Sequence, residues 1–235
     1  MESICGKRTL HIDADTLANR VAGASVVLVD IGTGDGRYVL QAARAGSSWF
    51  AIGVDACREN MRTASRTAPR NALFVIADAC TLPDELRGMA TRIAINFPWG
   101  SLLRGLLDGD TGLLSGLASL ARPDPHARKS GATLEIRLNG GALSEVGWTL
   151  QAGGEQVRQV LAGNGFSVGW PALLDARALR ACPTTWAKRL AFGRDPRALY
   201  VRAIVPAPAC AYELTSPAAS PHCFAGLAHN SETTP

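Results

Sequence analysis

Three glycines at alternate positions follow a run of β-branched residues and one acid in the stretch VVLVDIGTGDGR, residues 26–37. Glycine has no Cβ, so the backbone of such a bend can approach a ligand closely. A loop that binds nucleoside triphosphates needs Lys and then Ser or Thr after its last glycine, but Arg37 and Tyr38 follow here. A dinucleotide-binding loop has the spacing G-x-G-x-x-G, and this bend is one residue shorter. The bend therefore disfavours both nucleotide classes.

Two acids flank the bend, and each follows an expected strand. Asp30 precedes the glycines, where a carboxylate would repel a pyrophosphate and attract an ammonium group. Asp55 lies about 20 residues beyond them, where a carboxylate can bind two ribose hydroxyls. S-adenosylmethionine has a ribose and a cationic end but no phosphate. The alternative is a tight turn with helix-capping acids; the order of strand, bend, helix and second acid favours the cofactor.

Short apolar runs alternate with helical patterns along the chain, which predicts an α/β fold with a mostly parallel sheet and helices on both faces. The expected strands are residues 26–29, 50–54, 73–77, 92–97, 132–138 and 199–205. The expected helices are residues 38–45, 58–67, 101–107, 113–120, 155–162, 173–180 and 186–192. Ligands of such sheets bind beyond the carboxyl ends of the strands. The polar residues expected there are Asp30, Asp55, Asp78 and the group Asn96–Trp99.

Composition and charge narrow the class of protein. The chain has 235 residues, of which 47% are hydrophobic and 19% charged, as suits one α/β domain. Residues 1–205 are expected to form it, and residues 206–235, rich in Pro, Ala and Ser, to be disordered. Six scattered cysteines and four dispersed histidines argue against a zinc site or a disulfide framework and for the cytoplasm. The net charge of +4 permits an anionic partner. No apolar segment predicts a membrane span or an export signal.

Three segments together resemble one enzyme family: GKR at 6–8 with DIGTGDGR, FPWGSLLRG at 97–105, and TWAKRLAFGR at 185–194. The chain resembles the aminoglycoside-resistance 16S rRNA (adenine-N1) methyltransferases of the kanamycin–apramycin resistance type. The resemblance implies a class I, Rossmann-like fold with a mostly parallel, seven-stranded sheet. It also implies S-adenosylmethionine as cofactor and methylation of adenine N1 in the decoding site of 16S rRNA, within the assembled small ribosomal subunit. We expect a monomer that uses no metal and binds no membrane.

The resemblance also assigns residues. Trp99 and Trp186 would sandwich the target adenine, with Phe97 and Pro98 beside them, whereas plain packing under helices is the alternative for both indoles. The expected cofactor-binding residues are Asp30, Gly32, Thr33, Gly34, Gly36, Asp55, Ala56, Asp78, Ala79, Asn96 and Ser101. The expected RNA-binding residues are Lys7, Arg8, Arg66, Arg70, Lys188, Arg189, Arg194 and Arg197.

Two positions depart from the family pattern. Cys80 stands where the family tends to have an acid, and we expect Asp78 to take over contact with the cofactor's adenine. Asn96 makes the stretch N-F-P-W partly similar to the N-P-P-aromatic motif of enzymes that methylate exocyclic amines. An adenine exocyclic-amine methyltransferase, a small-molecule methyltransferase and a catalytically silent RNA-binding homologue therefore stay open as alternatives. A nicotinamide dehydrogenase is the weakest, because the glycine spacing and Asp30 disfavour it.

Overall fold

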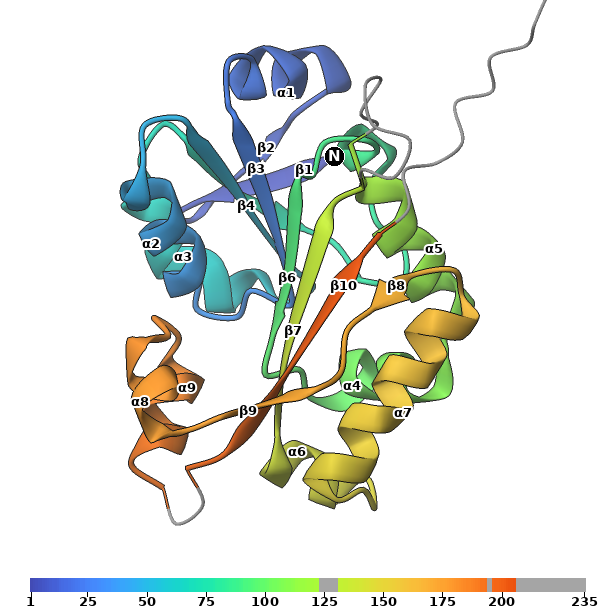
Figure 1. The fold of residues 1–235 in the computed structure, drawn as a ribbon. Coiled ribbons are helices and arrows are strands. Elements are labelled where there is room, and N and C mark those ends of the chain that lie inside the picture. Colours follow the sequence, from blue (N-terminus) through green and yellow to red (C-terminus); the bar gives the residue numbers. More distant parts are fainter. Residues whose placement is uncertain (123–130, 194–195, 206–235) are drawn as a thin grey trace, which may run out of the picture.

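A computed structural model describes residues 1–122, 131–193 and 196–205. The expected tail at 206–235 and the predicted RNA-binding residue Arg194 lie outside the described residues. Figure 1 shows a twisted central sheet with helices on both faces, which confirms the predicted fold class. Among the described residues, no helix combines the length and the hydrophobicity that a membrane span requires.

The sheet has a parallel centre and antiparallel edges. Its strands run in the order β2-β1-β5-β4-β3-β6-β7-β10-β8, and β9 also pairs with β10. Pairing is parallel from β5 to β7 and antiparallel at β1, β2, β8, β9 and β10. The strands are β1 Glu2–Cys5, β2 Arg8–His11, β3 Val26–Ile31, β4 Trp49–Asp55, β5 Ala72–Ile76, β6 Arg92–Asn96, β7 Thr133–Asn139, β8 Ser167–Val168, β9 Ala172–Leu174 and β10 Ala198–Ile204.

Alternate residues of the central strands pack against helices on opposite faces. Leu28 contacts the cluster under α2 and α3, whereas Val27, Val29 and Ile31 belong to the cluster under α1, α4, α5 and α7. The helices are α1 Ala14–Val21, α2 Arg37–Ala45, α3 Arg58–Arg66, the 3-10 turn Asp84–Leu86, α4 Gly100–Asp108, α5 Thr111–Leu120, α6 Gly140–Glu145, α7 Leu150–Gly163, α8 Ala176–Ala181 and α9 Thr185–Ala191.

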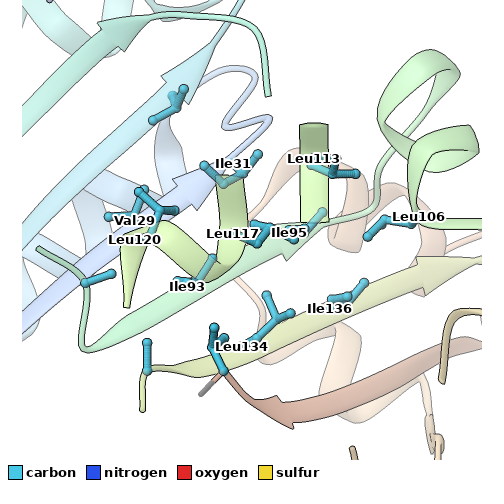
Figure 2. Close-up of a cluster of buried hydrophobic side chains, with 14 of the residues drawn as sticks. Val29, Ile31, Ile93, Ile95, Leu106, Leu113, Leu117, Leu120, Leu134 and Ile136 are labelled. Carbon is cyan, nitrogen blue, oxygen red and sulfur yellow. The ribbon is translucent and has the colours of Figure 1, made fainter. Parts of the chain in front are cut away.

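The larger core lies between the parallel strands and the helices α4 and α5. Figure 2 shows isoleucine, valine and leucine side chains of β3, β6 and β7 directed toward the leucines of these two helices. Ile31, Ile93 and Ile95 are fully buried, as are Leu113 and Leu117. This apolar layer fixes the strands, so their carboxyl ends form a rigid edge.

A separate small unit covers the other side of that edge. Helices α8 and α9 pack on one another, and a third apolar cluster joins them to the sheet. In Figure 1 the pair lies on the same side of the sheet as α2 and α3. The cluster consists of Phe97, Leu179, Cys182, Ala187, Ala191 and Ala198.

The expected strands and most expected helices are present, with two kinds of difference. The helix predicted at 173–180 is instead β9 followed by α8, because Leu173 pairs with Leu199 and the Asp175 side chain caps a helix that starts at Ala176. The sheet has ten strands within the described ranges, where seven were expected. Four strands are additional to the six that were predicted by residue range: β1 and β2 of the short hairpin, and β8 and β9 along β10, which are too short to show a clear alternation.

The glycine bend is packed most closely at Gly36, the residue just before α2. It begins α2 with φ 72°, and an added Cβ would lie 2.5 Å from Phe74 Cε1 and 2.7 Å from Ala64 Cβ. Gly34 has φ 56° and nothing within 4 Å of the same position. We expect Gly36→Ala to lower the free energy of unfolding by about 2–4 kcal/mol and Gly34→Ala by about 1–2 kcal/mol, measured by urea denaturation. Equal losses would contradict the close packing at Gly36.

Candidate active site

One pocket of about 450 Å³ opens at the carboxyl ends of β3, β4, β5 and β6 and is bordered by the start of α9. All the predicted catalytic and cofactor-binding residues except Gly36 line it: Asp30, Gly32, Thr33, Gly34, Asp55, Ala56, Asp78, Ala79, Asn96, Phe97, Pro98, Trp99, Ser101 and Trp186. Gly36 instead packs beneath α2 against Phe74. The pocket therefore unites segments that lie up to 156 residues apart (from Asp30 to Trp186).

Asp30 forms the buried floor of this pocket. Its side chain is nearly inaccessible, with 1% of the residue exposed. The Thr33 hydroxyl donates to Oδ2 at 2.6 Å, and the Asn96 amide donates to Oδ1 at 2.9 Å. Burial nevertheless raises the pKa of Asp30 to about 7. A cationic group in the pocket would supply the countercharge that this desolvated carboxylate attracts.

Asp55 and Asp78 are oriented by the turns that follow them. Asp55 accepts from the backbone N–H of Gly34 at 2.8 Å and of Cys57 at 2.9 Å, one at each oxygen. Each oxygen keeps a second lone pair, so the carboxylate can still accept from two hydroxyls. Asp78 accepts from the N–H of Cys80 at 2.8 Å. These bonds fix both carboxylates at the pocket wall.

Two indole rings meet at the pocket. The centroids of Trp99 and Trp186 are 5.3 Å apart and their planes are inclined by 33°. Trp186 is 41% exposed, so it is not a core residue, and the Arg189 guanidinium lies 5.4 Å from the centre of its ring. Trp99 is partly buried, and its Nε1 has no hydrogen-bond partner among the described residues. Two aromatic faces are therefore brought together where a planar ligand could enter.

The turn at Phe97 places both indoles. Phe97 is the one non-glycine residue of the described chain with a positive φ, at 53°. Its backbone N–H donates to the Arg137 carbonyl at 2.7 Å, while its side chain, 2% exposed, packs in the α8–α9 cluster. Phe97 borders the pocket, but its ring supports α9 instead of facing a ligand. The same turn directs Trp99 and anchors the helix that carries Trp186.

Comparison with known proteins identifies the family to which these features belong. The family model described as "NpmA: 16S rRNA (adenine(1408)-N(1))-methyltransferase" matches residues 2–205. The chain belongs to this family. It is 33% identical over 203 residues to the 16S rRNA (adenine(1408)-N(1))-methyltransferase of Escherichia coli, covering 80% of this chain and 91% of that relative.

Similar solved structures are methyltransferases as well. A variant of the 16S rRNA (adenine(1408)-N(1))-methyltransferase from Catenulisporales acidiphilia, determined with its cosubstrate SAM, superposes with a TM-score of 0.75 at 28% identity. The match covers 89% of this chain and 98% of that one. The aminoglycoside resistance methyltransferase NpmB1 gives a TM-score of 0.70 at 29% identity, over 87% and 98% of the two chains. The predicted family and fold are therefore confirmed.

Several residues of the pocket were not predicted from the sequence of this adenine-N1 methyltransferase family member. Asp35, Asn60, Leu102, Thr184 and Thr185 also line it. Thr185 Oγ1 donates to Asp35 Oδ2 at 2.5 Å, a contact that ties α9 to the glycine bend across 150 residues. Asp35 lies within the bend and the two threonines precede Trp186, so proximity to those motifs was the available signal.

Cys80 also lines the pocket, at the place where the family tends to have an acid. Burial, together with Asp110 and Asp78, raises the pKa of its thiol to about 11. The thiol is therefore neutral and does not replace a carboxylate. Asp78 is the charged group left on that wall, as the sequence suggested.

The predicted RNA-binding residues fall into two groups of exposed side chains. Lys7 and Arg8 are in the β1–β2 hairpin, which is held against α3 by a bond from the Arg58 guanidinium to the Lys7 carbonyl at 3.4 Å. Arg66 ends α3 and Arg70 precedes β5, so both lie toward the amino ends of the strands, away from the pocket. Lys188 and Arg189, by contrast, follow Trp186 on α9, and Arg197 precedes β10.

The buried carboxylate predicts a pH dependence of stability. Asp30 has a pKa of about 7 in the folded protein against an ordinary value of 3.8, so its proton is bound more tightly in the native state. The resulting stabilisation is complete below pH 3.8 and is lost as the pH rises to about 7. In Asp30→Asn, the free energy of unfolding should fall by a few kcal/mol less over this pH range than in the natural protein. Urea denaturation of the ligand-free protein at several pH values measures the difference.

The matched control is Asp84→Asn, which neutralises a carboxylate that is 87% exposed, pairs with the exposed Arg87 and does not line the pocket. This variant should retain the pH dependence of the natural protein. If Asp30→Asn and the natural protein lose stability in parallel between pH 4 and pH 7, the buried carboxylate is not its source.

Proposed function

We propose that the protein transfers the methyl group of S-adenosylmethionine to N1 of an adenine in the decoding site of 16S rRNA, within the assembled small ribosomal subunit. The observation that carries this proposal is the meeting of Trp99 and Trp186 over a pocket whose floor is Asp30. The names of its relatives agree with it.

The pocket suits the cosubstrate group by group. Asp30 is a buried carboxylate that would bind the ammonium group, and Asp55 has free lone pairs for the ribose hydroxyls. Asp78 is in place for the exocyclic amine of the adenine. The volume of about 450 Å³ is in the range of small-molecule sites. When bound, the cosubstrate supplies an electrophilic methyl group; the residues of the chain position it.

The two indoles would hold the target base after it leaves the RNA stack. In the free protein they contact one another, and a base between them replaces one stacking contact with two. Stacking on an aromatic side chain contributes roughly 1–3 kcal/mol per base, which can offset the few kcal/mol needed to extrude a base. The rings must separate to admit it, and the α9 side of the pair is the more exposed one.

The site acts by alignment and needs no general base. Adenine N1 has a free lone pair near pH 7, so holding it in line with the methyl group and sulfur is an effect of proximity and orientation. The methylated ring becomes cationic, and backbone carbonyls around Phe97 and Pro98 would stabilise that charge. A carboxylate could also stabilise this charge, but Glu135, on the neighbouring strand, pairs with Arg92 at 2.5 Å and does not line the pocket.

Asn96 argues against methylation of the exocyclic amine. Its amide N–H donates to Asp30, and its carbonyl oxygen accepts from the Arg137 guanidinium at 2.8 Å. Both ends of the side chain are thus engaged inside the protein, and its oxygen is directed to Arg137, which makes Asn96 a poorer acceptor for a substrate amine than a free amide. N1 is therefore the favoured target atom.

The exposed cations around the indoles support a large anionic substrate. Lys188 and Arg189 would contact phosphates that flank the extruded base, and Lys7 and Arg8 would reach RNA farther along. We further propose that the enzyme acts as a monomer in the cytoplasm, where the ribosomes are. By analogy with its resistance-conferring neighbour, expression should protect a host against kanamycin-like and apramycin-like drugs.

The decisive experiment incubates purified small subunits with the protein and labelled S-adenosylmethionine. We expect label in 16S rRNA and a primer-extension stop at one decoding-site adenine, because N1 methylation blocks base pairing. Trp99→Ala and Trp186→Ala should each lower kcat/KM roughly 100-fold and leave cosubstrate affinity unchanged. Trp170→Ala is the control, since this indole is 78% exposed and does not line the pocket.

Each contrary outcome is informative. Cosubstrate binding without labelled RNA would indicate a silent homologue or a small-molecule enzyme. Label without an extension stop would indicate another target atom. Unchanged turnover in both tryptophan variants would refute the clamp.

A second prediction concerns the α9 cations. Replacing Lys188 and Arg189 together by alanine should weaken binding to small subunits. It should also reduce the slope of log K against log salt by roughly 1–2, because the variant neutralises fewer phosphates and its binding therefore releases fewer counterions. Filter binding at several salt concentrations measures this slope. The control replaces Arg87 and Arg122, which flank the amino end of β6 at the opposite end of the sheet. An equal fall in slope for both pairs would show that α9 is not the contact.

A further inference from the structure

A row of polar side chains crosses the face of the sheet that α2 covers. It begins at Asp30 on β3, continues through Asn96 on β6 to Arg137 on β7, and ends at Glu135 and Arg92. Arg137 and Asn96 are directly paired across neighbouring strands. Apart from Arg92, the members of this row are largely withdrawn from solvent; the side chain of Arg137 is 17% exposed and that of Glu135 is 10% exposed. It is therefore an internal network and not a surface ion pair.

Arg137 is held in place on all sides. Its guanidinium lies 5.7 Å from the ring centre of Tyr38 and 5.4 Å from that of Tyr200. Its Nη2 is 3.4 Å from Glu135, whereas Glu135 is closer to Arg92 at 2.5 Å. Arg137 Nη1 donates to Asn96 Oδ1 at 2.8 Å, a shorter contact than the one to Glu135. Much of its charge is thus directed toward the pocket through one amide.

The chemistry of the neighbours fixes the orientation of that amide. A guanidinium can only donate hydrogen bonds, and an ionised carboxylate can only accept them. Asn96 between Arg137 and Asp30 therefore points its oxygen to the first and its N–H group to the second. Hydrogen bonds in such a chain polarise one another, so donation from Arg137 strengthens the bond from Asn96 to Asp30.

We propose that Arg137 is a positioning residue for the cosubstrate, acting through Asn96 to hold the Asp30 carboxylate ionised and oriented toward the ammonium group. The inference rests on the proposed function only in taking S-adenosylmethionine as the ligand. No residue of this row beyond Asp30 and Asn96 touches the pocket. The sheet thus carries a remote countercharge to the binding site.

The groups that face Asp30 have opposing effects on its pKa. Burial raises its pKa, and Asp55 on β4 raises it further, whereas Thr33, Asn96 and Arg137 lower it. Tyr38 from α2 and Glu135 from β7 complete the surroundings, and burial raises the pKa of the Tyr38 phenol, which keeps it neutral. Loss of Arg137 would move the Asp30 pKa above about 7, so the carboxyl would be protonated at neutral pH and would bind an ammonium group less well.

The test measures binding of S-adenosylhomocysteine, which has the ribose and the ammonium group but no transferable methyl, by calorimetry from pH 5.5 to 7.5. The ligand's own amine stays mostly protonated over this range, so the change in affinity reports on the protein. For the natural protein we expect affinity to rise with pH as Asp30 ionises. For Arg137→Met the rise should be displaced upward by about one pH unit, a roughly tenfold weaker Kd at pH 6 that narrows toward higher pH. Asn96→Leu should behave alike, and Arg137→Lys should restore part of the effect.

The matched control is Arg44→Met, which removes an exposed arginine from α2 on the same side of the sheet. It should leave the pH profile of binding unchanged. An equal weakening at every pH in Arg137→Met and Asn96→Leu would show a structural role alone and overturn the inference, as would an unaltered Kd. If Arg137→Met does not fold, Arg137→Lys and Asn96→Leu decide by the same profile. Failure of the natural protein to bind the ligand at any pH would instead refute the proposed function.

Discussion

The site depends on the backbone of a single residue. Phe97 adopts a left-handed conformation directly after β6, which costs of order 1–3 kcal/mol for a residue with a side chain. Burial of its ring among the apolar residues of α8 and α9 offsets that cost. Because the ring points to α9 and the next turn carries Trp99, one strained position determines where both indoles lie. The constraint couples the sheet edge, which would hold the cosubstrate, to the helix pair that would border the target base.

Charges of opposite sign are separated between the inside and the outside of the pocket. Carboxylates gather inside the pocket, where Asp30, Asp55 and Asp78 end successive strands. Cations gather outside it, on α9 and on the β1–β2 hairpin. The cosubstrate is cationic and the proposed RNA substrate is anionic, so each meets the opposite sign along its own approach. Within the internal row, Arg137 acts on Asp30 through Asn96 and so favours the ionised carboxylate without placing a positive group in the pocket that would repel the cosubstrate.

Much of this arrangement could be predicted because parallel strands present their carboxyl ends at one edge. The acids at 30, 55 and 78 and the turn after 96 were assigned to the pocket on that rule alone. Contacts between distant segments could not be predicted in this way. The bond from Thr185 to Asp35 and the cross-strand pair of Asn96 with Arg137 depend on register, which a single sequence does not reveal. The error at 173–180 has a similar origin, because a short apolar run suits either a strand or a helix until its pairing partner is known.

The mutual contact of Trp99 and Trp186 has a consequence for selectivity. Since the rings already shield one another, an entering purine gains only the difference between two stacked faces and the one it displaces. That difference is one stacking contact, roughly 1–3 kcal/mol, which is less than the entropy cost of immobilising a free nucleotide, so we expect free adenine nucleotides to bind the cleft weakly. On the proposed function, recognition would then come from the RNA around the extruded nucleotide. Methyl transfer would then depend on the RNA that presents the base, and free adenine nucleotides would be left unmodified.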